Sequence, residues 1–167
     1  MSVQSEDHTV LSNIALAIAR VAQSHGCDRE ALLRDAGINP DSIHHAESRI
    51  SSGQHQKLWA LVIEHTGRPC IALDIASAIS PGAIHGLGLG WLVSDTLRSA
   101  LERLIRFQRL VSTNVDIALE ESASAYELIY QARSLPADFQ PASGDALLIL
   151  TMRLCRMALS ESIRPLR

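Results

Sequence analysis

The sequence predicts an α+β domain in which a helical part precedes a smaller part built around an antiparallel hairpin. Three observations predict it. Apolar residues recur at helical spacing through most of residues 10–80. Two runs that alternate apolar and polar residues follow, at 115–121 and 126–132. A strongly apolar helical run over 145–159 comes last. Helices and strands that are segregated along the chain in this way are typical of α+β folds.

The first part contains four predicted helices, each bounded by a capping residue, a proline or a glycine. The first helix is predicted over 10–25 and ends before Gly26, and the second over 28–36, with Asp28 as N-cap and Gly37 past its end. The third is predicted to start near Ser51 or Ser52 and to end at Gly67. The fourth is predicted over 68–80, with Pro69 in its first turn.

A serine–proline–glycine turn at 80–82 marks the internal boundary between the two parts. A helix over 96–111 follows, with Thr96 as its N-cap. The two alternating runs form a hairpin around residues 122–125, and a loop over 135–144 leads to the last helix. A two-stranded ribbon is rarely stable alone, so we expect its edges to pair with another segment.

The composition of the chain limits the classes of protein to which it can belong. The chain has 167 residues, 47% of them hydrophobic and 20% charged, which predicts one folded domain with a substantial core. The net charge of -3 argues against a chain that holds DNA by itself, since such proteins carry a basic balance or face. The N-terminus has no signal-peptide pattern and no apolar run reaches membrane-spanning length, so we expect a soluble, cytoplasmic protein with no membrane partner.

Cofactor and metal motifs are absent from the sequence. The three cysteines are widely separated and form no CxxC pair, and the seven histidines include no HExxH spacing. Three glycines alternate at Gly86, Gly88 and Gly90, but Trp91 and Val93 stand where a dinucleotide fingerprint needs its third glycine. We therefore expect no cofactor, and we interpret the glycines as sites of close backbone packing or of missing side chains beside a cavity.

Two further patterns leave alternatives open. Residues 31–43 have the spacing of a helix-turn-helix, but 38–48 contain no Lys or Arg, so a plain helical corner is the better interpretation. Arg98, Arg106 and Arg109 share a helix face with Glu102. That face is either solvated, with an ion pair from Glu102 to Arg106, or an anion site for a carboxylate effector.

Several segments occur in an order that resembles a known family. They are "LLRDAGINPDSI", "ESRISSGQHQKLWALVIEHTGRPCIALDIA", "SPGAIHGLGLGWLVSDTLRSALERLIRFQRLVS", the hairpin, and an apolar helix ending in "SIRPLR". Over residues 10–167 the chain is similar to the N-terminal effector domain of AraC-type bacterial transcription regulators, in the branch called arabinose-binding. The resemblance implies a domain that senses a small molecule and supports dimerisation. It also implies that promoter DNA is bound through a separate C-terminal domain with two helix-turn-helix units, which this chain does not contain.

The predicted organisation is a flexible tail over 1–9 and an effector-binding and dimerisation domain over 10–167. We expect a non-enzymatic sensor of a small effector whose identity the family label does not fix. The effector is expected between the hairpin and the helices, in a largely apolar pocket with a few polar groups. The predicted lining residues are His85, Trp91, Arg106, Tyr126 and Tyr130.

The helix over 145–159 is apolar on more than one face, which predicts either a homodimer surface or burial in the domain's own core. The alternative function is a stand-alone small-molecule binding module or an enzyme of unknown chemistry.

Overall fold

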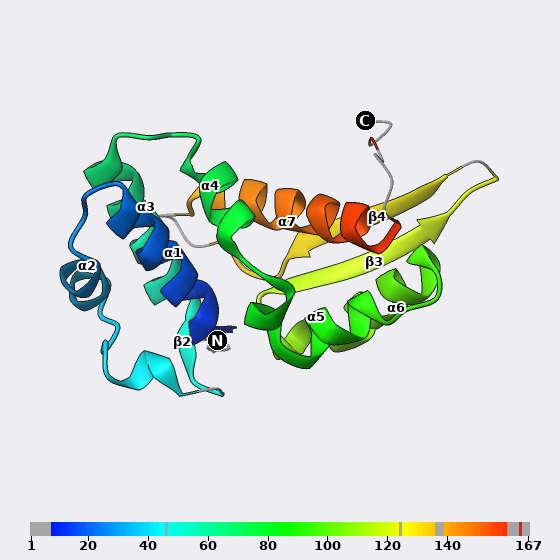
Figure 1. Ribbon diagram of the computed structural model, residues 1–167, viewed down its shortest axis with the longest axis horizontal. Helices are drawn as coiled ribbons and strands as arrows, with labels where there is room; N and C mark the ends of the chain where they lie inside the picture. The colour runs from blue at the N-terminus through cyan, green and yellow to red at the C-terminus, as the bar shows by residue number, and fades with distance from the viewer. Residues whose placement is uncertain (1–7, 46, 124, 136–138, 160–163, 165–167) are drawn as a thin grey trace, which may run out of the picture.

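The computed structural model describes residues 8–45, 47–123, 125–135, 139–159 and Arg164, and it confirms the α+β class. Figure 1 shows a helical part and, beside it, a long hairpin with helices packed along it. In chain order the elements are β1 (Thr9–Leu11), α1 (Ser12–Ser24), α2 (Arg29–Asp35), η1 (Ser42–His44), β2 (Arg49–Ser51), α3 (Ser52–Thr66), α4 (Ile71–Ala78), η2 (Pro81–Ile84), α5 (His85–Leu92), α6 (Leu97–Phe107), η3 (Gln108–Leu110), β3 (Val115–Glu121), β4 (Tyr126–Ala132) and α7 (Pro141–Leu159).

The predicted helix caps of the first part are present. The Asp28 carboxylate accepts hydrogen bonds from the backbone N–H groups of Glu30 (2.9 Å) and Ala31 (3.0 Å). Ser51 forms a reciprocal capping box with Gln54 at the start of α3. Gly67 ends α3 in the left-handed conformation, with φ of 60°, which glycine adopts without steric cost. These local signals positioned the second and third helices correctly. The fourth helix was predicted over 68–80 with Pro69 in its first turn, but α4 begins at Ile71 with Cys70 as its N-cap, so Pro69 lies before the helix.

One feature of the first part was not predicted. Residues 9–11 form β1, although Thr9 was predicted in the flexible tail and residues 10 and 11 in the first helix; residues 1–7 of that tail lie outside the described residues. Residues 49–51 form β2, which pairs antiparallel with β1. Val10 also forms an isolated bridge with Ser112, so β1 lies between β2 and the segment that follows α6. Three residues are too few for an alternating pattern to be recognised, and this small sheet is defined by partners that are distant in sequence.

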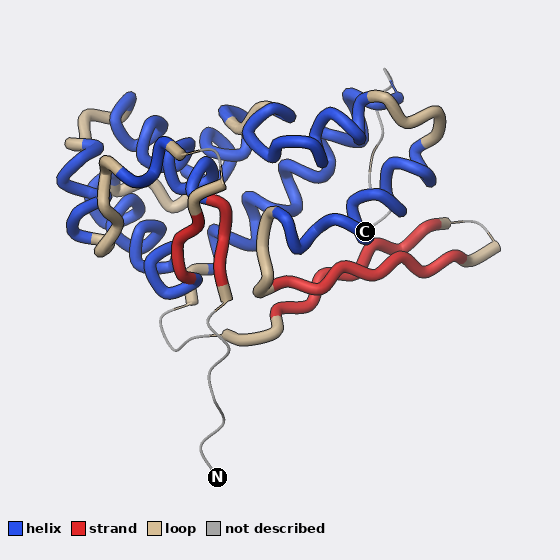
Figure 2. Tube along the Cα trace, turned by 90° about the horizontal axis from the view of Figure 1, so that it is seen from below, coloured by secondary structure: helices blue, strands red, loops and turns tan. Residues whose placement is uncertain are grey.

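The second part is a two-layer arrangement. The hairpin of β3 and β4 pairs Val115 with Ala132 and Glu121 with Tyr126. Its inner face packs on α6 and α7, and Figure 2 shows both helices on the same side of the hairpin. The inner face carries apolar side chains together with Tyr130, whereas the outer face carries exposed residues such as Glu120 and Glu127.

Three details of the second part differ from the prediction. α7 begins at Pro141 instead of 145, because proline suits the first turn of a helix and Gln56 of α3 binds the backbone N–H of Gln140 at 2.8 Å. Residues 85–92 form a helix where no element was predicted. No other described strand lies beside the hairpin, so packing on α6 and α7 supports it in place of the expected edge pairing.

The two parts share one hydrophobic core and are joined at a seam. The Trp91 indole N–H on α5 donates to the backbone oxygen of Leu154 on α7 at 2.9 Å. The Arg153 guanidinium donates to the backbone oxygens of Ala76 and Ile79, at the end of α4. The second part is therefore attached to the helical part along α4, α5 and α7.

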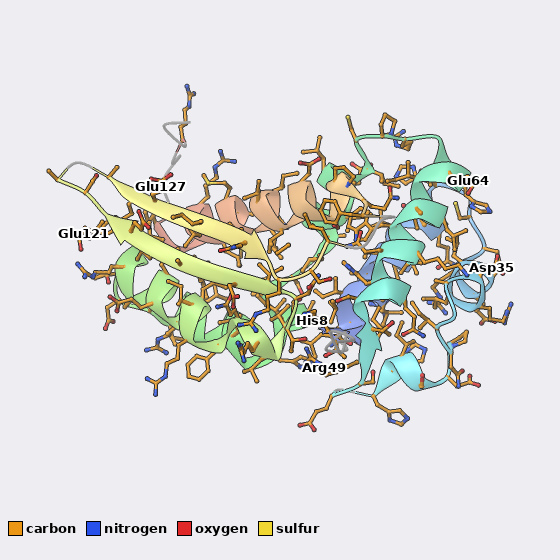
Figure 3. All side chains as sticks on the ribbon, turned by 180° about the vertical axis from the view of Figure 1, so that it is seen from behind. His8, Asp35, Arg49, Glu64, Glu121 and Glu127 are labelled. Atoms are coloured by element: carbon orange, nitrogen blue, oxygen red, sulfur yellow. The ribbon has the colours of Figure 1, made fainter. Side chains whose placement is uncertain are left out.

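A second attachment lies at the N-terminus. Leu11 N–H donates to the oxygen of Val111 at 2.9 Å, and Thr113 N–H donates to the oxygen of Thr9 at 3.0 Å. Arg49 of β2 donates to Thr9 Oγ1 at 2.7 Å and to the oxygen of Leu110 at 2.7 Å. Figure 3 places Arg49 at this seam. We call these contacts between β1, β2 and residues 110–113 the clasp.

Within the described residues, no single helix is both long and apolar enough to cross a membrane. One pair, Ile71–Ala78 with Pro81–Leu92, meets the length and composition criteria together, but it is bent by 82°.

Candidate functional site

A surface hollow of about 300 Å³ lies where the helical part meets the 80–82 boundary. One wall is α1, and the other is the end of α4 with the start of η2. The residues that line it are Asn13, Leu16, Ala17, Arg20, Ala78, Ser80 and Ala83. We call this space the junction hollow.

The α1 wall of the junction hollow is a single helical stripe. Asn13, Leu16, Ala17 and Arg20 follow the i, i+3, i+4, i+7 spacing that places side chains on one face of a helix. The stripe is polar at both ends and apolar in the middle. Other α1 residues, such as Ala15, Ile18 and Ala22, are fully buried and fix the orientation of the helix. The sequence of α1 therefore both anchors the helix and presents this stripe.

His85 adjoins the polar end of the stripe. Its Nε2 lies 3.1 Å from Asn13 Nδ2, so a hydrogen bond joins α1 to the first residue of α5. The backbone of His85 has φ of 52°, which is the one positive φ among described non-glycine residues. A β-carbon in this region costs about 1–3 kcal/mol, and such strain is found disproportionately at functional positions. The fold thus holds His85 in a costly conformation beside the hollow.

Arg20 stands at the other end of the stripe. It is the one charged residue among those lining the junction hollow. Its side chain is exposed, and no ion pair or hydrogen bond joins it to any residue that the structure describes. A guanidinium offers five N–H donors in a planar fork that matches a carboxylate. The hollow therefore presents an unused cation to solvent.

A larger hollow, of about 470 Å³, lies between α1, α2 and the corner that follows α2. Its charged residues have both signs, and Glu30 and Arg34 form an ion pair at 3.3 Å. Asp28, at the start of α2, is occupied by its capping bonds, which lower the pKa of its carboxyl group. The larger hollow mixes acidic and basic side chains, whereas Arg20 is the one charged residue lining the junction hollow, so we regard the junction hollow as the stronger candidate despite its smaller volume.

Three of the predicted site residues lie elsewhere. Trp91 is buried in the core, with its indole N–H bound to Leu154. Arg106 is exposed on α6, and its guanidinium lies 5.4 Å from the ring centroid of Phe107. The Tyr126 hydroxyl lies near the hairpin's outer end and donates to Glu121 Oε1 at 3.2 Å.

Tyr130 faces α7 from the inner side of β4. Its hydroxyl lies 2.6 Å from Thr151 Oγ1, which in turn donates to the backbone oxygen of Leu147 at 2.9 Å. Burial raises the pKa of Tyr130 to about 12, so the phenol stays protonated at neutral pH. The structure does not bring the five predicted residues together, and of these only His85 adjoins a described hollow.

The arginine face of α6 is paired differently from the prediction. Glu102 binds Arg98 at 3.0 Å, not Arg106, because Arg98 also reaches Glu121 of β3 at 3.0 Å. Arg98 thereby ties α6 to the hairpin. That part of the predicted anion site is already occupied by carboxylates of the chain itself.

The interpretation of the glycines as close-packing residues is confirmed at Gly88. A β-carbon at this position would overlap the backbone carbonyl group of Pro81, so only glycine lets α5 approach η2 this closely. At Gly86, by contrast, no atom lies within 4 Å of the position that a β-carbon would occupy. Gly88 thus fixes the course of the chain between the 80–82 boundary and His85.

Asn13, Arg20 and Ser80 were not predicted as site residues. The available signal was a pair of polar residues seven positions apart on a strongly apolar helix, but such a pair is also typical of a solvated helix face. No group of His, Cys, Asp and Glu side chains suitable for a metal ion occurs in the described part of the chain.

A small α+β domain with a hollow lined by polar and apolar residues at an internal junction has the features of a ligand-binding module. Comparison with protein families identifies it further. Residues 26–167 match the model of the arabinose-binding domain of AraC transcription regulators, found N-terminally in those proteins. The chain therefore belongs to this family, and it is a ligand-sensing regulatory domain. The family is a regulatory one and not a family of enzymes. No curated protein matches the sequence.

Proposed function

We propose that this domain senses its effector in the junction hollow, and that it does so as the non-enzymatic sensor of a dimeric, DNA-binding transcription regulator. The observation that carries the proposal is the hydrogen bond between Asn13, which lines the hollow, and the strained His85, together with the unpaired Arg20 in the same lining. Trp91, Arg106, Tyr126 and Tyr130 remain proposals as effector-binding residues, although none of them lines this hollow.

The position of the hollow supports a sensing role. Its two walls belong to α1 in the helical part and to the segment around the 80–82 boundary, which leads directly into α5. A ligand that contacts both walls favours one relative arrangement of them, and it shifts the population in proportion to its differential affinity. We propose that residues 10–167 act as one effector-binding and dimerisation domain, with this boundary as the place where its two parts adjust.

A test of the site uses a metabolite library and thermal unfolding of the chain. Ala78→Phe places a large side chain in the hollow from an exposed position of α4, whereas Ser77→Phe adds the same side chain one residue away and outside the lining. We expect a library compound to raise the Tm of the wild type and of Ser77→Phe but not of Ala78→Phe. Equal shifts for all three proteins would place the effector elsewhere.

Dimerisation is proposed through the outer face of α7. Leu148 and Leu159 are exposed on this helix and lie eleven residues, or about three turns, apart, so they share one of its faces. Sedimentation of the wild type and of Leu148→Glu measures this, with Val93→Glu on exposed apolar surface after α5 as the control. We expect only Leu148→Glu to dissociate the dimer, and a monomeric wild type at high concentration would contradict the proposal.

The remaining parts of the proposal concern the whole regulator. A protein that joins this domain to its C-terminal helix-turn-helix domain is expected to bind promoter DNA with an affinity that the effector changes. A mobility-shift assay with and without effector tests this. NMR of the ligand after incubation with the domain is expected to show it unchanged, as a sensor requires and an enzyme would not.

A further inference from the structure

We infer that the junction hollow recognises a small, elongated organic anion, with a carboxylate bound by Arg20 and a second polar group bound near Asn13 and His85. This inference rests on the proposed function and names the chemical class of the effector. It is supported by the distribution of charged, apolar and polar residues along the hollow and by the length of the hollow.

The Arg20 end of the junction hollow determines the sign of the ligand's charge. Arg20 is the lone charged side chain in the lining, and no described carboxylate pairs with it. The nearest acidic residue of the α4 wall, Asp74, already binds His25 at 3.2 Å and Arg68 at 3.6 Å. A cationic ligand would meet the guanidinium with no compensating carboxylate, whereas a carboxylate gains a charge-assisted pair of hydrogen bonds.

The middle of the hollow determines the body of the ligand. Leu16 and Ala17 on one side face Ala78 and Ala83 on the other, so the two walls are apolar and their side chains are short. A chain of methylene groups fits this region, because its transfer from water to an apolar surface is favourable. A sugar would place hydroxyl groups against alanine side chains, where they would find no partner.

The polar end and the helix geometry determine the length. Asn13 and Arg20 are seven residues apart, which corresponds to about 10 Å along the helix axis. The Asn13 amide, the His85 imidazole and the Ser80 hydroxyl supply hydrogen-bonding groups for the second end of the ligand. The volume of about 300 Å³ is at the small end of the range for small-molecule sites.

Calorimetric titration with linear dicarboxylates of increasing length tests the inference, with the matching diamines as charge-reversed controls. We expect the affinity of the wild type to pass through a maximum at one chain length, and we expect the diamines not to bind. Arg20→Gln should weaken the best dicarboxylate about tenfold or more, and Arg20→Lys should retain part of the affinity. Arg29→Gln, in the larger hollow, should leave the affinity unchanged.

A second variant separates binding from stability. His85→Gly removes the imidazole and also relieves the positive φ, so it should weaken the dicarboxylate several-fold without lowering the Tm. Weaker binding together with an unchanged or higher Tm cannot result from partial unfolding. Wild-type affinity in both His85→Gly and Arg20→Gln would overturn the inference.

The failure of this inference is distinguishable from the failure of the proposed function. If no dicarboxylate binds but a library compound of another class does, and Ala78→Phe abolishes its binding, the hollow is the sensor site and the anionic class is wrong. If Arg29→Gln abolishes dicarboxylate binding and Arg20→Gln does not, the anion binds in the larger hollow and both proposals fail.

Discussion

His55 on α3 is a residue whose protonation is coupled to folding. Trp59 donates its indole N–H to His55 Nε2 at 3.1 Å, and the two rings are edge-on, with centroids 6.3 Å apart. The acceptor role requires a neutral ring with a lone pair at Nε2. Burial lowers the pKa of His55 from 6.5 to about 4. Folding therefore excludes a proton that the unfolded chain binds below pH 6.5.

The sign of the pH dependence follows from this difference in pKa. Between about pH 6.5 and pH 4 the unfolded chain holds a proton at His55 that the folded chain lacks, so stability falls as the pH falls through this window. The lowering of the His55 pKa corresponds to a loss of up to about 3 kcal/mol in the free energy of unfolding. We expect His55→Gln to lose less unfolding free energy than the wild type between pH 7 and pH 4.5, as measured by urea unfolding at both pH values. An identical loss in both proteins would contradict the prediction.

Individual residues could be predicted from sequence where their role is local. Asp28 and Ser51 act within three residues of themselves, so their side-chain chemistry was sufficient to identify them as caps. Arg20 lines the junction hollow together with a wall that lies about 60 positions further along the chain, at Ala78 to Ala83. Nothing in the local pattern distinguishes such a residue from one on a solvated helix face. The aromatic residues chosen for the site were placed by packing instead, as Trp91 illustrates.

At the scale of elements, the contact between α5 and η2 depends on one missing side chain. Gly88→Ala would drive a β-carbon into the carbonyl of Pro81 and force the two elements apart. We expect a loss of about 1–3 kcal/mol, measured by chemical unfolding.

Gly86→Ala is the matched control in the same helix. The space around Gly86 is open, and alanine favours a helix over glycine by up to about 1 kcal/mol, so stability should stay the same or rise. Similar losses in both variants would show that overlap with Pro81 is not what makes glycine necessary at position 88.

The long elements were predictable because each carries its own periodicity. The amphipathic pattern of α6 and the alternation of β3 and β4 were sufficient, and the observed strands keep the predicted bounds of 115–121 and 126–132. β1 and β2 were missed because each has three residues and is defined by its neighbours. α5 was missed because its three glycines are poor helix formers, and tertiary packing overrides that preference.

At the scale of the whole molecule, the clasp joins the first residues of the fold to the segment after α6. Arg49 contacts the oxygens of Leu110 at 2.7 Å and of Arg109 and Val111 at 3.5 Å. Burial lowers the pKa of Arg49 without removing its charge. A lysine keeps that charge but lacks the planar fork that reaches several acceptors at once.

Arg49→Lys should therefore loosen the clasp while the rest of the domain stays folded. We expect faster hydrogen exchange at the amides of Leu11 and Thr113, which donate across the clasp, and unchanged exchange at the buried amides of α3. Arg34→Lys, on the exposed face of α2, serves as the control. Wild-type protection at Leu11 and Thr113 in Arg49→Lys would show that the strand pairing alone holds the two parts together.

The clasp also orders events during synthesis of the protein. Thr9 bonds to Thr113, 104 positions later, so the first strand cannot find this partner until residue 113 has left the ribosome. The four helices of the first part are complete by then and can pack against one another, because all of them lie within residues 12–78. Closure of the clasp is consequently a late step, in which a nascent chain with a finished helical part captures the segment that has just emerged.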